Sequence, residues 1–270
     1  MDERPILTIA LGDAAGVGPE ITAKALLDEG VRAMCRPLLV GNKWVLERAF
    51  ALAGGRLAVR QVSSAAEARF EDGVLDLLEM DNLDPADVTP GRVNIATGRE
   101  SGETMVRATH LVQRGEAQGI VSAPVNKAAL GAAGFGHGHA QVIANALGWK
   151  EPVLSLLSGP KLKVLNMTGH CSLAEACRRV TFDLIVSSLE TLNTSFQRWG
   201  YTTVRIAVAA LNPHAGDAGA FGQEEIEVIG PAVKAAQSQG IGARGPFAAD
   251  TLFARALDGE FDMVLAMYHD

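Results

Sequence analysis

Residues 6–30, "ILTIALGDAAGVGPEITAKALLDEG", join an apolar run to a segment with the apolar spacing of a helix. Pro19 ends the glycine-rich turn between them and suits the first position of a helix. The same pairing recurs along the chain, and further apolar runs lie at residues 36–40, 119–125, 163–168, 203–211 and 261–268. Because these runs have no polar face, we predict parallel strands covered by helices on both sides, which is an α/β fold.

The composition is that of a folded globular protein. Of the 270 residues, 48% are hydrophobic and 20% are charged, so neither disorder nor a fibrous repeat is indicated. The net charge is −7 and no cluster of lysine and arginine stands out, which argues against binding to nucleic acid or to an anionic membrane. No stretch approaches the roughly 20 apolar residues of a membrane span, and no signal peptide is recognisable. We therefore expect a cytoplasmic protein with no nucleic-acid or membrane partner.

One polar segment punctuated by proline, residues 81–98, interrupts the alternation of strands and helices. It is either a surface loop or a connection between two lobes of the molecule. A helix is predicted directly after it, over residues 99–119, with His110 on the solvent face.

Three of the six histidines, His170, His214 and His269, come directly after predicted strands. In parallel sheets, ligands bind outside the carboxyl ends of the strands, where the loops converge. Imidazole is the commonest metal ligand in proteins, and three convergent histidines with an open position hold a catalytic divalent metal. The three lie too far apart in the sequence for a local motif. They are therefore either separate loop residues or a metal site that only the fold brings together.

Other polar residues near strand ends extend this hypothesis. Asp250 and Asp270 could orient the imidazoles or act as acid and base, although Asp250 also suits the N-cap of the helix that follows it. Lys127 follows another strand and either meets an anion or is simply exposed, and His139 lies in a glycine-rich turn that is either an anion cradle or only a turn. The first turn, residues 12–20, matches neither the P-loop nor the G-x-G-x-x-G pattern, so no dinucleotide motif is present there.

Seven motifs taken together resemble the 4-hydroxythreonine-4-phosphate dehydrogenase family, which includes relatives that act on threonate or erythronate 4-phosphate. They occur in the family's order over essentially the whole chain, and the last three form the most specific combination. The motifs are "GDAAGVGPE" (12–20), "APVNK" (123–127), "GHGHAQ" (136–141), "GHCSL" (169–173), "NPHAGDAGAFGQEE" (212–225), "GPFAADTLF" (245–253) and "VLAMYHD" (264–270).

The resemblance implies an isocitrate/isopropylmalate dehydrogenase-like fold, in which residues 1–270 form one α/β chain of two interleaved subdomains with an intervening cleft. It also implies a homodimer whose active site is shared between the subunits. His170, His214 and His269 would then hold a divalent metal, which is zinc, magnesium, cobalt or manganese. His139, with Ala140 beside it, would contact the substrate.

The implied reaction is the oxidation of a secondary alcohol by NAD or NADP, followed by decarboxylation of the β-keto acid that results. The substrate would be a phosphorylated hydroxy acid such as 4-phosphooxy-threonine, an intermediate of pyridoxine biosynthesis, or threonate 4-phosphate. We expect Asp250 and Asp270 to act as catalytic groups, and Lys127 to contact the substrate together with His139 and Ala140. No residue in the chain is assigned to the nicotinamide cofactor.

Two features depart from the family pattern. Ala140 and Gln141 stand where threonine and glutamate are usual, and the chain stops at Asp270 where the family continues with further substrate and cofactor residues. We therefore expect weak or absent dehydrogenase activity if the protein ends there. The alternative functions are a dehydrogenase of a non-phosphorylated cyclic diol carboxylate, a phosphate acyltransferase and a non-catalytic metabolite-binding protein. The three histidines argue against the acyltransferase, which would not need them.

Overall fold

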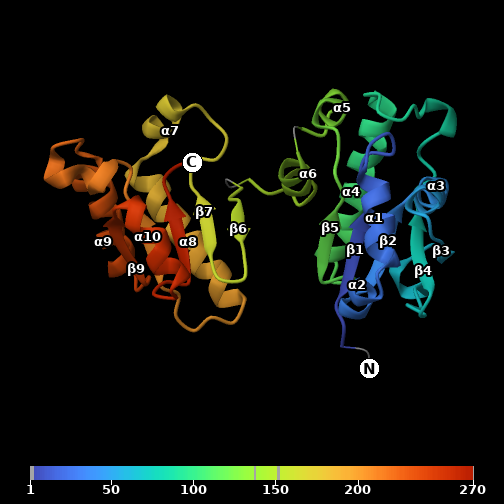
Figure 1. Ribbon diagram of the computed structural model, residues 1–270, viewed down its shortest axis with the longest axis horizontal. Helices are drawn as coiled ribbons and strands as arrows, with labels where there is room; N and C mark the ends of the chain where they lie inside the picture. The colour runs from blue at the N-terminus through green and yellow to red at the C-terminus, as the bar shows by residue number, and fades with distance from the viewer. Residues whose placement is uncertain (1–2, 137, 151–152, 270) are drawn as a thin grey trace. The chain divides into compact units, whose positions relative to one another are not determined.

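The computed structural model describes residues 3–136, 138–150 and 153–269. The chain forms two compact units, Met1–Val153 and Leu154–Asp270, each built around its own five-stranded sheet (Figure 1). The predicted α/β class is confirmed, because both sheets consist mainly of parallel strands with helices packed against them. Interleaving of the two subdomains stays a prediction. The described helices include none that is both long enough and apolar enough to cross a membrane.

The first unit has an all-parallel sheet in the order β3-β4-β2-β1-β5. Its strands are β1 (Ile6–Ala10), β2 (Arg36–Gly41), β3 (Ala58–Val62), β4 (Val74–Glu79) and β5 (Gly119–Ser122). Its α-helices are α1 (Gly18–Leu27), α2 (Glu29–Met34), α3 (Lys43–Ala53), α4 (Ile95–Gln113), α5 (Lys127–Ala132) and α6 (His139–Ala146), with short 3-10 turns at Ala65–Glu67 and Pro85–Asp87.

Alternate side chains of the strands face different helices, which explains why the apolar runs have no polar face. Ile9 and Leu39 pack with Phe50 in a cluster that also contains residues of α1 and α3. Their neighbours in the strands point the other way, so that Ala10 and Leu38 pack in a second cluster with residues of α4. Both faces of the sheet are therefore buried, as expected for parallel strands.

The second unit has a sheet in the order β6-β7-β10-β8-β9, in which only the edge strand β6 is antiparallel. Helices α8 and α9 cover one face and α10 covers the other. Its strands are β6 (Leu156–Ser158), β7 (Lys163–Asn166), β8 (Ile206–Ala209), β9 (Ala243–Phe247) and β10 (Met263–Ala266). Its helices are α7 (Leu173–Arg179), α8 (Phe182–Arg198), α9 (Gly230–Ser238) and α10 (Ala249–Leu257), with a 3-10 segment η3 (Pro213–Gly219) and a π-helix η4 (Glu225–Ile229).

The structure decides between the two alternatives for segment 81–98, and it corrects the predicted start of the next helix and the placement of His110. The segment 81–98 lies wholly inside the first unit, so it is not a connection between lobes, and its last residues already belong to α4, which begins at Ile95. Asn94 explains this earlier start, because its side chain accepts a hydrogen bond from the N–H of Ala96 and caps the helix. His110 is not on a solvent face, since it is half-buried and its Nε2 lies 3.2 Å from the carbonyl oxygen of Ala146.

A buried carboxylate at the centre of β4 ties the first sheet to its neighbouring loop. Asp76, only 1% exposed, accepts hydrogen bonds from Nε of Arg60 at 2.6 Å and from the backbone N–H groups of Arg69 and Phe70. Burial alone would raise the pKa of Asp76, but the hydrogen bonds from Arg60 and these N–H groups outweigh it and lower the pKa. The carboxylate therefore stays ionised in the folded protein at pH values below those at which an aspartate usually takes up its proton.

Asp76→Ala should lower the free energy of unfolding by about 3 kcal/mol, because it leaves the Arg60 guanidinium and two backbone N–H groups without their acceptor. Urea denaturation measures this loss. Glu71→Ala is the control, since Glu71 pairs with the same arginine but is half exposed, and we expect less than about 1 kcal/mol from it. Equal losses in the two variants would contradict the role given to Asp76.

Candidate functional site

The three predicted histidines follow three neighbouring strands of the second sheet. His170 comes after β7, His269 after β10 and His214 after β8, and these strands lie next to one another in the order β7-β10-β8. The strands are parallel, so their carboxyl ends share one edge of the sheet. All three imidazoles are exposed there. The topology therefore places residues that are distant in sequence on the same edge of one unit.

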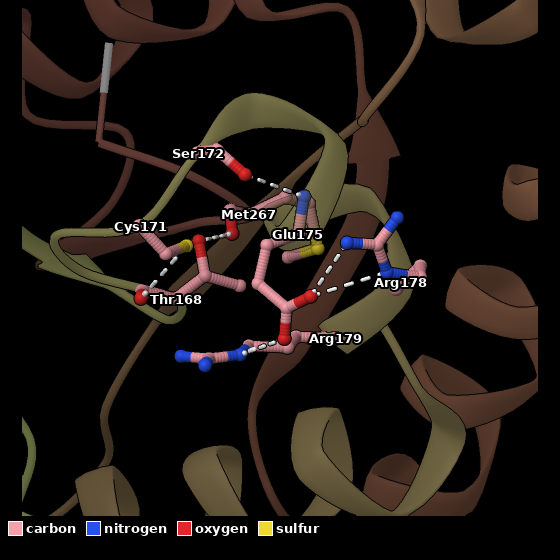
Figure 2. Close-up of polar contacts among 7 residues, drawn as sticks. All are labelled: Thr168, Cys171, Ser172, Glu175, Arg178, Arg179 and Met267. Carbon is pink, nitrogen blue, oxygen red and sulfur yellow. Dashed lines mark hydrogen bonds and ion pairs between the residues drawn. The ribbon is translucent and has the colours of Figure 1, made fainter.

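Two of the three histidines are brought into contact. The ring centroids of His170 and His269 lie 4.9 Å apart, with the ring planes tilted by 34°. The loops that carry them are joined, because the buried hydroxyl of Thr168 donates a hydrogen bond of 3.0 Å to the carbonyl oxygen of Met267 (Figure 2). Thr168 thus fixes the register between the segment before His170 and the segment before His269.

Local hydrogen bonds also hold the turn that carries His170 (Figure 2). Ser172 caps α7, since its hydroxyl accepts a hydrogen bond of 3.2 Å from the N–H of Glu175. The Glu175 carboxylate in turn accepts from the side chains of the two arginines that end the helix, and these bonds lower its pKa. The Cys171 thiol lies 3.6 Å from the carbonyl oxygen of Thr168. Contacts made by Thr168, Cys171 and Ser172 therefore hold the turn after β7 on either side of His170.

His214 occupies a different local structure, the segment η3. Its backbone is left-handed, with φ 53° and ψ 28°, and Nδ1 lies 3.6 Å from Oδ2 of Asp250. Asp250 is not the N-cap predicted from the sequence: α10 begins at Ala249, and Asp250 is in its first turn, where a carboxylate complements the helix dipole. At this distance the two groups are close neighbours without a hydrogen bond between them.

The described residues of a single chain do not bring the three predicted histidine ligands together. Among the described residues, no group of three or more His, Cys, Asp or Glu side chains is arranged to hold a metal ion. The pair formed by His170 and His269 supplies two imidazole donors of the type that divalent transition metals prefer, and His214 is not grouped with them. The predicted residue Asp270 lies outside the described residues.

The predicted substrate residues lie in the first unit, around the carboxyl end of β5. His139 begins α6, and its Nε2 is 3.1 Å from the carbonyl oxygen of Ala123, which can only accept, so Nε2 carries the proton. Nδ1 is therefore the acceptor of the neutral ring. Lys127 is the first residue of α5 and is exposed, as is Ala140 beside His139. An ammonium group and an imidazole are thus placed at the end of one strand.

The sequence analysis did not identify a buried polar cluster at the carboxyl ends of β1, β2 and β4. Glu100 in α4 is fully buried, and one of its oxygens accepts from the side chains of Asn42 and Thr104, each at 3.3 Å. The other oxygen has no hydrogen-bond partner among the described residues. Burial raises the pKa of Glu100 to about 8, and the nearby carboxylates of Asp13 and Glu103 act in the same direction. Glu100 is therefore protonated at neutral pH.

A glutamate at the end of the motif around His214 was also missed. Glu225 is 6% exposed, and its carboxylate accepts from the backbone N–H groups of Leu211 and Asn212 at 2.9 and 2.7 Å. The only signal in the sequence was its place in the quoted motif, since nothing in the spacing marks it as buried.

A parallel α/β fold with histidines, a lysine and carboxylates at the carboxyl ends of its strands is typical of enzymes that convert small metabolites. Residues 33–270 match the model of a family described as "Pyridoxal phosphate biosynthetic protein PdxA". The chain belongs to this family, which confirms the resemblance inferred from its motifs.

Relatives with different names match nearly the whole chain. It is 40% identical over 271 residues to the D-threonate 4-phosphate dehydrogenase of Cupriavidus necator, an alignment that covers 100% of this chain and 81% of the relative. A crystal structure of a 4-hydroxythreonine-4-phosphate dehydrogenase from Burkholderia phymatum matches with 39% identity and a TM-score of 0.89, covering 100% and 82% of the two chains. A terephthalate 1,2-cis-dihydrodiol dehydrogenase from Burkholderia xenovorans matches with 26% identity and a TM-score of 0.67, covering 99% and 80%.

Proposed function

We propose that this protein is a metal-dependent dehydrogenase that uses NAD or NADP to oxidise the secondary hydroxyl group of a 4-phosphorylated hydroxy acid and then decarboxylates the product. The substrate is 4-phosphooxy-threonine or threonate 4-phosphate. Relatives named for these two substrates align with nearly the whole chain at 39–40% identity. The structural observation that carries the proposal is the contact between His170 and His269 at the carboxyl edge of the second sheet.

In this proposal His170, His214 and His269 hold one divalent ion, which is zinc, magnesium, cobalt or manganese. A bound ion supplies a Lewis acid that polarises the hydroxyl oxygen of the substrate. The protein is a homodimer whose active site takes groups from both subunits. Such a shared site accounts for the incomplete set of donors in a single chain, where only two of the three imidazoles are in contact.

The remaining groups take roles that suit their chemistry. The ammonium group of Lys127 and the imidazole of His139, with Ala140 beside it, bind the substrate, and the positive charge of Lys127 favours its phosphate. Asp250 orients the imidazole of His214, from which it lies 3.6 Å, and Asp250 and Asp270 move protons during the reaction. The two α/β units would be the subdomains of an isocitrate/isopropylmalate dehydrogenase-like fold.

A second candidate is the oxidation of a non-phosphorylated cyclic diol carboxylate. The relative from Burkholderia xenovorans, named for a dihydrodiol substrate, shares 26% identity over nearly the whole chain. Ala140 also favours it, because a methyl group follows His139 where the usual family pattern has a threonine hydroxyl. A site with fewer polar groups discriminates less strongly in favour of a phosphorylated chain.

Comparing each phosphorylated substrate with its dephosphorylated counterpart distinguishes the two candidates. We expect NADH or NADPH formation, measured by absorbance in the presence of a divalent metal, to have a kcat/KM about 100-fold higher for threonate 4-phosphate or 4-phosphooxy-threonine than for the same acids without phosphate, because a charged contact is lost. A cyclic diol carboxylate should be turned over no faster than these dephosphorylated acids. Preference for the diol would replace the first candidate by the second.

A further inference from the structure

The turn that carries His214 has an unfavourable backbone conformation. Five consecutive residues of η3, from His214 to Ala218, have positive φ between 43° and 78°. Gly216 is the only glycine among them. The other four are disfavoured in this left-handed region, because Cβ comes too close to the following carbonyl oxygen. A run of this kind persists only when groups outside it restrain the chain.

One buried carboxylate holds the residues at which the chain enters this turn. Oε1 of Glu225 accepts from the N–H of Leu211 at 2.9 Å and from the N–H of Asn212 at 2.7 Å, at the point where the chain leaves β8. Oε2 accepts from the side-chain amide of Asn212 at 2.9 Å. Two backbone donors and one side-chain donor just before His214 are therefore satisfied by a single buried side chain.

The same carboxylate lies against the inside of the turn. A Cβ added at Gly216 would lie 2.8 Å from Oε2 of Glu225, so no larger residue fits there without moving the carboxylate. Glu225 is also the first residue of the π-helix Glu225–Ile229, which runs directly into α9 and so joins the carboxylate to the packed core of the second unit. π-helical turns are rare and occur frequently at functional sites.

These contacts stabilise the ionised form of the Glu225 carboxylate. Burial alone would raise its pKa, but the hydrogen bonds from the Asn212 side chain and from the backbone N–H groups outweigh this and lower the pKa. An ionised carboxylate accepts from several donors at once, whereas a neutral amide of the same shape presents an NH₂ group to some of them.

We propose that Glu225 is a positioning residue that holds the left-handed turn of His214 in the conformation that binds metal. This inference rests on the proposed function, in which His214 is a ligand. Glu225 itself touches neither substrate nor metal, and it acts only through the position of the imidazole. Replacing a residue that orients a metal ligand from the outer shell typically lowers the affinity for the metal by about 10- to 100-fold.

The test compares Glu225→Gln with Glu227→Gln, an exposed residue of the same π-helix. Co²⁺ alone is titrated into the metal-free full-length protein and followed by its visible absorption. We expect Glu225→Gln to weaken the affinity for Co²⁺ by about 10- to 100-fold and Glu227→Gln to leave it unchanged. Hydrogen exchange of the amides of Leu211, Asn212 and residues 214–218 should become faster in Glu225→Gln only.

A double-mutant cycle separates positioning from a general structural effect. His214→Ala should itself weaken Co²⁺ binding, and adding Glu225→Gln to it should cause no further loss, because the two residues act through one ligand. If His214→Ala leaves Co²⁺ affinity unchanged, the proposed role of His214 fails and the inference fails with it. If His214→Ala weakens binding but Glu225→Gln does not, or if their effects add, the metal site stands and the positioning role of Glu225 is wrong.

Discussion

Replacing His170 by alanine should lower kcat/KM for the phosphorylated substrate by about 10³-fold, and His269→Ala should do the same. The reason is that a bound metal contributes several kcal/mol to stabilising charge in the transition state, and each imidazole is one of the donors that hold it. The two rings already lie 4.9 Å apart. Steady-state kinetics and the metal content of the purified variants measure the effect.

The double variant distinguishes a shared ion from two separate roles. If His170 and His269 hold the same ion, the variant that lacks both should be little worse than either single variant, because the ion is lost once. His110→Ala is the control, since His110 lies in the first unit and contacts only the carbonyl of Ala146 in the described hydrogen bonds. Full metal content in both single variants, or multiplied losses of activity in the double variant, would contradict the shared site.

The positions of these histidines could be predicted from the sequence because they depend on local signals. An apolar run that ends before His170, His214 or His269 marks the carboxyl end of a strand, and parallel strands share that edge. The contact between His170 and His269 could not be predicted in the same way. It depends on β7 and β10 being neighbours in the sheet, and nothing in the spacing of the two histidines along the chain states that order.

The left-handed conformation of the turn at His214 also could not be predicted from the sequence. Ala215 and Ala218 favour right-handed structure, and nothing in the neighbouring sequence predicts the positive φ values that they adopt. Asp250 shows a similar limit. Its position before an apolar segment suits an N-cap, whereas the N-cap is Ala248 and the helix begins two residues earlier, within the usual error of a helix boundary.

Glu100 gives the second large effect, a dependence of stability on pH. The pKa of its side chain is about 8 in the folded protein against 4.5 without the fold. Below pH 4.5 the group is protonated in both states, and above pH 8 it is ionised in both. Between these values only the folded state holds the proton, so each rise of one pH unit favours unfolding about tenfold. Across the window the folding equilibrium should shift on the order of a thousandfold.

Glu100→Gln should remove this dependence, because the amide has nearly the same shape and stays neutral at every pH. Its oxygen can still accept from Asn42 and Thr104, which now donate to Glu100 at 3.3 Å each. Urea denaturation at pH 5 and pH 8, with hydrogen exchange in α4, should show a variant close to the wild type at pH 5 and much more stable at pH 8. The exposed Glu47, changed to glutamine, is the control and should match the wild type at both values. A difference in stability between Glu100→Gln and the wild type that does not change with pH would mean that this carboxyl group does not titrate in that window.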